Sequence, residues 1–159
     1  MSDRIAVMRA GRFMEIATPE ELYYHPKTPF AAEFIGGANV IAGQVSDRRD
    51  GALAAVITSF GEVWVAGAPA TGQVKLFIRP ERVILAGNGG DVAPSRNQFS
   101  CTLVSDLFIG EGRELDLRPV GDTGHTILRC RARGVSAAKA DERFHVQIPP
   151  EDVTVLVAD

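Results

Sequence analysis

The stretch Ile78-Arg79-Pro80-Glu81-Arg82-Val83 closes an apolar alternation with three charged side chains and a proline. It returns in altered form as Ile148-Pro149-Pro150-Glu151-Asp152-Val153. Neighbouring arginine and carboxylate side chains could bind an anion or transfer protons, whereas a proline has no backbone N–H and ends a strand. Because the phrase occurs twice, we interpret it as a structural corner in preference to an active site.

A row of arginines is the other unusual polar pattern. Arg129, Arg131 and Arg133 alternate with Cys130 and Ala132, so a strand would send all three guanidinium groups to one face. Such a face could receive an oxyanion or an acidic partner. The alternative, which we favour, is a solvated strand face that resists aggregation.

Motifs for catalysis, metals and cofactors are missing. The sequence has no GxxxxGK[ST] phosphate loop, and Gly110-Glu111-Gly112 is not followed by a helical pattern, which predicts a turn or bulge. The three histidines are isolated, and Cys101 and Cys130 lack metal-site spacing, which predicts inert thiols. We therefore predict no catalytic, cofactor-binding or metal-binding residue in this chain.

Composition indicates a folded domain with little affinity for nucleic acid. The 159 residues are 45% apolar and 23% charged, with a net charge of −3. This balance excludes a disordered chain and argues against a protein that neutralises phosphates. No apolar run approaches the ~18 residues of a membrane helix, and the N-terminus lacks a secretory pattern, so we expect a cytoplasmic location.

The first 36 residues predict a β-hairpin and two short helices. Apolar runs at 5–8 and 13–16 flank a glycine-containing turn. Thr18 and Thr28 each precede a proline and are predicted to cap helices; Phe30, Phe34 and Ile35 are predicted to share an apolar face.

From residue 39 onward, short alternating runs separated by turn residues predict a mainly β fold, a small OB-like barrel or sandwich. Residues 72–78 align with 142–148 at an offset of 70. This favours a duplicated β unit with halves at about 38–86 and 97–159, joined by a glycine-rich connector at 87–94. The alternative is that two corners share turn chemistry.

A long pattern near the N-terminus resembles the closing segment of the ATP-binding subunit of a binding-protein-dependent ABC importer of the polyamine, sugar or iron type. The matching positions are Ser2-Asp3-Arg4-Ile5, Val7-Met8, Gly11-Arg12, Thr18-Pro19, Glu21, Tyr23, Pro26, Phe30, Glu33-Phe34-Ile35-Gly36 and Asn39. Ala17 stands where that family usually has glycine. The remainder resembles the transport-associated OB (TOBE) region, through Arg79-Pro80-Glu81 and Leu107-Phe108-Ile109-Gly110.

This resemblance implies two parts: residues 1–37, the end of an ATPase domain, and residues 38–159, a TOBE domain. The family's phosphate loop, signature motif, catalytic glutamate and switch histidine would lie upstream of Met1. ATP and Mg²⁺ are therefore implied only for an intact subunit, which would be a transport ATPase. The first hairpin would normally extend the ATPase sheet, and an edge carrying Ile5, Val7, Phe13 and Ile16 predicts association.

The family's role implies a non-catalytic regulatory and dimerisation domain. The partners it implies are a second copy, permease subunits at the inner face of the cell membrane, and a small ligand or regulatory protein. An alternative is a small-oxyanion site, as in molybdate-binding relatives of this fold. Nucleic-acid binding is not expected, because the chain is acidic and has one Trp and two Tyr.

Overall fold

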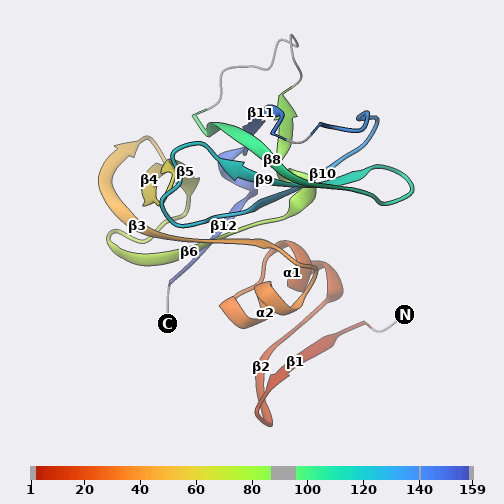
Figure 1. The fold of residues 1–159 in the computed structure, drawn as a ribbon. Coiled ribbons are helices and arrows are strands. Elements are labelled where there is room, and N and C mark those ends of the chain that lie inside the picture. The colour runs from red at the N-terminus through yellow and green to blue at the C-terminus, as the bar shows by residue number, and fades with distance from the viewer. Residues whose placement is uncertain (1–2, 87–95, 140, 158–159) are drawn as a thin grey trace.

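The computed structural model describes residues 3–86, 96–139 and 141–157, so the predicted connector at 87–94 lies outside the described residues. The described residues form strands, two α-helices and two short 3₁₀ turns (Figure 1). In chain order they are β1 (Ile5–Arg9), β2 (Arg12–Ala17), α1 (Pro19–Tyr24), α2 (Pro29–Phe34), β3 (Asn39–Asp50), β4 (Leu53–Thr58), β5 (Gly61–Ala66), β6 (Gly72–Ile78), η1 (Pro80–Arg82), β7 (Ile84–Ala86), β8 (Gln98–Phe108), β9 (Arg113–Pro119), β10 (Leu128–Ala132), β11 (Arg143–Gln147), η2 (Pro150–Asp152) and β12 (Val153–Val157).

The N-terminal hairpin forms as predicted. β1 and β2 pair antiparallel across Ala10 and Gly11, whose φ angles of 48° and 77° give the two left-handed residues that a tight hairpin turn requires. Of the residues on the predicted association edge, Val7 is only 2% exposed and packs with Leu22 and Ala31 of the helices. Association through this edge stays a prediction. The outer face retains the exposed apolar side chains Met8, Phe13, Met14 and Ile16.

Both predicted helices are present and begin at the predicted caps. Thr18 and Glu21 form a reciprocal capping box on α1, and the Thr28 hydroxyl accepts from the backbone N–H of Ala31 on α2. The predicted apolar face of α2 is wrong at Phe34, which is 68% exposed and stacks on Phe30. Ala31 and Ala32 are the buried residues of this helix, because their small side chains allow close packing.

Two five-stranded antiparallel sheets enclose one core, which confirms the mainly β prediction. Their strand orders are β12-β6-β3-β4-β5 and β7-β11-β8-β9-β10. The two sheets therefore have equivalent strand orders. β3, β4, β5, β6 and β7 occupy the same positions as β8, β9, β10, β11 and β12, respectively. The halves also exchange their last strands: β7 pairs with β11 and β12 pairs with β6. This shared order supports duplication, while the limits of the two halves stay predictions.

Strands β3 and β8 are long, with 12 and 11 residues, although the sequence predicts short runs here. Each contains an irregular register, between Val45 and Arg49 in β3 and between Leu103 and Ser105 in β8. Such bulges bend a strand and allow it to continue around a barrel. β10 begins at Leu128, after a loop in which Thr126 hydrogen-bonds Asp122.

The repeated phrase forms two corners, as predicted. η1 follows β6 and η2 follows β11, so each proline-containing turn carries the chain from one sheet to the other. Arg82 and Asp152, which occupy equivalent positions in the two phrases, form an ion pair at 3.4 Å. In Figure 1 the helices and the first hairpin lie together at one end of the two sheets.

Candidate functional site

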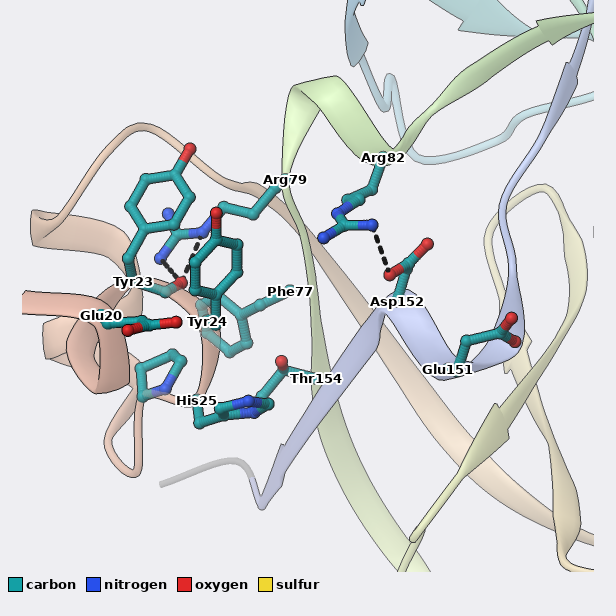
Figure 2. A pocket seen from close by; sticks show the side chains of 11 residues that line it. Glu20, Tyr23, Tyr24, His25, Phe77, Arg79, Arg82, Glu151, Asp152 and Thr154 are labelled. Atoms are coloured by element: carbon teal, nitrogen blue, oxygen red, sulfur yellow. Dashed lines mark hydrogen bonds and ion pairs between the residues drawn. The ribbon is translucent and has the colours of Figure 1, made fainter.

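The helix–barrel junction is built around Arg79, which is only 7% exposed at the end of β6. Its Nε and Nη2 atoms donate to the carbonyl oxygen of Tyr23 at 2.9 and 2.5 Å, and Nη1 donates to the carbonyl oxygen of Ile35. These carbonyls lie at the C-terminal ends of α1 and α2, where the helix dipoles favour a positive charge. One guanidinium therefore binds the ends of both helices to the barrel. Figure 2 shows the contact with Tyr23.

Tyr23 completes this junction. Its ring centroid lies 4.2 Å from the Arg79 guanidinium carbon, and its hydroxyl donates to a Glu81 carboxylate oxygen at 2.5 Å. Gly36 has a φ of 81°, and a Cβ there would lie 2.7 Å from the Tyr23 ring. The structure thus brings Gly36, Arg79 and Glu81 together, with Pro80 buried beside them. Their role as family-motif residues stays a prediction.

The Tyr23–Glu81 bond gives a testable pH dependence. Burial first, and then Glu81, raise the pKa of the Tyr23 hydroxyl above its usual value of 10.0. Because the folded state favours the neutral hydroxyl, the resulting stabilisation is present below pH 10 and is lost as pH rises through the folded pKa. We expect Tyr23→Phe to lower the free energy of unfolding by about 1 kcal/mol at pH 7. Urea unfolding should show this difference shrinking above pH 10; an unchanged difference would contradict the proposed bond.

Asn39, a predicted motif residue, links the two sheets. Its side-chain amide nitrogen donates to the carbonyls of Ile78 and Arg129 at 3.2 and 2.9 Å, and its oxygen accepts from the Arg129 N–H at 2.6 Å. Asn97, which sequence reasoning missed, repeats this pattern with Ile148 and Trp64: its nitrogen donates at 3.0 and 2.7 Å, and its oxygen accepts from the Trp64 N–H at 2.6 Å. The two asparagines lie at the start of β3 and just before β8.

Glu15 is a second missed residue. It is 8% exposed, and its carboxylate accepts from the backbone N–H groups of Lys27 and Thr28 and from the Thr28 hydroxyl, all at 3.0–3.2 Å. It therefore holds the start of α2 against β2. The only sequence signal was a charged residue at an inward position of a strand.

The predicted arginine face exists, but ion pairs occupy it. Arg129 lies within 3.3 Å of carboxylates of both Glu114 and Asp116, Arg131 lies 2.8 Å from Glu114, and Arg133 lies 3.1 Å from Glu111. These acidic residues belong to β9 and the turn before it, so they offset the positive charge. Gly110, with a φ of 88°, lies in this turn between β8 and β9. Its neighbours Ile109 and Glu111 line a hollow together with Tyr23, Glu81 and Arg131.

Both cysteines are unbridged and buried, in agreement with the prediction of inert thiols. Burial raises the pKa of each thiol to about 12, so neither is a thiolate at neutral pH. Among the described residues, no group of three or more His, Cys, Asp or Glu could hold a metal ion. No helix in this part of the chain is long and apolar enough to span a membrane.

The fold is an OB-type β fold. The structure aligns with the cytoplasmic molybdate-binding protein ModG at a TM-score of 0.63 and 17% identity, over 76% of this chain and 96% of that chain. This likeness defines the fold alone. No family model matches the chain.

Sequence comparison identifies the relatives as ATP-binding subunits of import ABC transporters. The spermidine/putrescine import ATP-binding protein of Pseudomonas aeruginosa is 38% identical over 74% of this chain and 31% of its own length. The corresponding protein of Borreliella afzelii is 31% identical over 98% of this chain and 41% of its own length. The sulfate/thiosulfate import ATP-binding protein of Chromobacterium violaceum is 35% identical over 82% of this chain and 33% of its own length.

The chain is therefore homologous to ABC importer ATP-binding subunits, as its sequence motifs indicated. The matched parts are about a third to two fifths of the length of these relatives.

Proposed function

We propose that this chain is a non-catalytic regulatory and dimerisation part of an ABC importer ATP-binding subunit. Homology to such subunits and an OB-type barrel support the proposal. In the intact subunit, ATP and Mg²⁺ would bind outside this chain, and hydrolysis would drive import through permease subunits at the inner face of the cell membrane. Residues 1–37 would be the end of the ATPase domain and residues 38–159 the TOBE domain.

The Arg79 contact carries this proposal. Because one buried guanidinium binds the ends of α1 and α2, the helix pair cannot shift without breaking hydrogen bonds to the barrel. Lys75 of β6 adds an ion pair to Glu33 of α2 at 3.2 Å. A movement of the ATPase part would therefore be transmitted to the barrel, and the reverse, as a regulatory domain requires.

Phosphate release from ATP tests whether the chain is non-catalytic. We expect no release above the buffer background with purified protein and Mg²⁺, because no phosphate loop is present in the sequence. Release that increases in proportion to protein, and co-elutes with it, would contradict the proposal.

The end of the β8–β9 hairpin is the surface on which we place the contact with a second copy. The turn between these strands projects from the side of the barrel in Figure 1. Val104, Leu107, Phe108 and Ile109 are 49%, 60%, 64% and 40% exposed. Four apolar side chains are therefore exposed within six residues at the end of this hairpin, and a symmetric dimer would bury those of each copy against the other.

The alternative is a small-oxyanion-binding domain, favoured by the fold shared with a molybdate-bound protein. The ion pairs along Arg129, Arg131 and Arg133 weigh against that strand face as the site. Calorimetric titration with molybdate, sulfate and phosphate distinguishes the two functions. The regulatory proposal expects no saturable heat, and a saturable signal with any of these anions favours the alternative.

A further inference from the structure

The open edge of β10 carries a side-chain amide where a neighbouring strand would pair. β10 lies at one end of its sheet, with β9 as its hydrogen-bonded neighbour. On the other side, the amide of Asn39 donates to the carbonyl oxygen of Arg129 at 2.9 Å and accepts from the Arg129 N–H at 2.6 Å. This amide therefore takes the place of one peptide group of an additional strand.

The same edge continues at Arg131 without such a partner. In an antiparallel pair the backbone groups of alternate residues point to the same side of the strand, so those of Arg131 point away from β9, as those of Arg129 do. Among the residues that the structure describes, no hydrogen bond engages the backbone N–H or carbonyl oxygen of Arg131. One donor and one acceptor are therefore available two residues beyond the position that Asn39 occupies.

A hollow of about 380 Å³ lies at this point of the edge. Residues 131–133 line it from β10 and its end, Tyr23 and Glu81 line it from the helix–barrel junction, and Ile109 lines it from the turn before β9. The Tyr23 hydroxyl donates to Glu81 at 2.5 Å, which holds the junction wall in place. The available backbone groups therefore lie beside a hollow that is already formed.

The charges beside this hollow favour an uncharged ligand. Arg131 is paired with Glu114 at 2.8 Å, and Arg133 is paired with Glu111 at 3.1 Å. A small ion would compete with these pairs, whereas a peptide group supplies one donor and one acceptor without net charge. The amide of Asn39 already binds the edge in this way.

We propose that the β10 edge at Arg131 binds an extended, uncharged peptide segment of a partner protein, which adds to the sheet as a short strand beside Tyr23. The paired part is short, because Asn39 occupies the edge at Arg129 and β10 ends at Ala132. β-Branched residues suit it, because they favour the extended conformation. The proposal goes beyond the regulatory and dimerisation role, since it needs only the open edge and holds equally for a monomer.

An NMR titration of the ¹⁵N-labelled protein with the peptide acetyl-Val-Thr-Val-Thr-amide tests this edge. We expect saturable shifts at residues 131–133 and at Tyr23, and slower hydrogen exchange of the Arg131 N–H when the peptide is bound. The control is the same peptide with methyl groups on its second and third backbone nitrogens. It should bind at least about tenfold more weakly, because it lacks the donor to the Arg131 carbonyl oxygen.

Two variants separate the backbone of Arg131 from its side chain. Arg131→Pro removes an N–H that points away from the sheet, where proline is tolerated, and should weaken binding at least about tenfold. Arg131→Ala keeps the N–H and removes the guanidinium, and should change the affinity less than about twofold.

Four results would overturn the proposal. They are no saturable shifts, shifts centred on another strand edge, equal binding of the methylated peptide, and an equal loss of affinity in the two variants with unchanged circular dichroism. If Arg131→Pro does not fold, the comparison of the two peptides still decides between backbone pairing and another mode of binding.

Discussion

Replacing Arg79 by alanine is expected to lower the free energy of unfolding by about 3 kcal/mol. The substitution removes the three hydrogen bonds that Arg79 donates to the carbonyls of Tyr23 and Ile35, and it removes the cation that lies over the Tyr23 ring. Because these carbonyls lie at a part-buried junction, water replaces the lost donors poorly. Urea unfolding followed by circular dichroism measures the loss.

Two matched variants separate the forked contact from charge alone. Arg79→Lys keeps the charge but cannot donate in two directions from a planar group, so we expect it to recover less than half of the loss. Arg82→Ala removes a neighbouring arginine whose side chain is 46% exposed and whose ion pair measures 3.4 Å; it should cost less than about 1 kcal/mol. Equal losses in Arg79→Ala and Arg82→Ala would contradict the junction described here.

Replacing Asn97 by alanine is expected to cost a similar amount, about 3 kcal/mol. Asn97 is 0% exposed, and the change leaves the Trp64 N–H and the Trp64 and Ile148 carbonyls without this partner. Because Trp64 belongs to one sheet and Asn97 precedes β8 of the other, the loss should loosen the contact between sheets. Tryptophan fluorescence during urea unfolding reports both the stability and the local change, since Trp64 is the single tryptophan.

The equivalent substitution, Asn39→Ala, provides an internal comparison. Its three hydrogen bonds match those of Asn97, so its loss should agree within about 1 kcal/mol, without the fluorescence change at Trp64. Gln98→Ala, next to Asn97 but exposed, should cost less than about 0.5 kcal/mol. A loss below 1 kcal/mol in both asparagine variants would show that these links do not hold the sheets together.

Local chemistry made the hairpin, the helix caps and the two corners predictable. Thr18 and Thr28 cap their helices through neighbours only three residues away, and the corners follow from prolines that cannot continue a ladder. The side of a strand that faces a partner depends on distant residues. For that reason the apolar face of α2 was predicted wrongly at Phe34, and the burial of Val7 against the helices was not predicted.

The contacts of the candidate site join residues far apart in the chain. Arg79 reaches Tyr23 across 56 positions, and Asn97 reaches Ile148 across 51. The periodicity of apolar residues in the sequence does not indicate which distant residues come into contact. One sequence signal could have found Asn97. Asn39 stands at the start of β3 and Asn97 just before β8, so an alignment of the two halves at these strands would have paired the two asparagines. The exchange of β7 and β12 between sheets could not have been inferred from turn residues.

Light scattering coupled to size exclusion tests the proposed dimerisation domain most directly. Without nucleotide, the account predicts a molar mass that rises with concentration toward twice the 17.1 kDa of the chain. Phe108→Ser at the end of the β8–β9 hairpin should return the protein to the monomer mass, whereas Phe13→Ser, which removes an equally exposed phenylalanine from the first hairpin, should not. A mass of 17.1 kDa at every concentration would contradict the account.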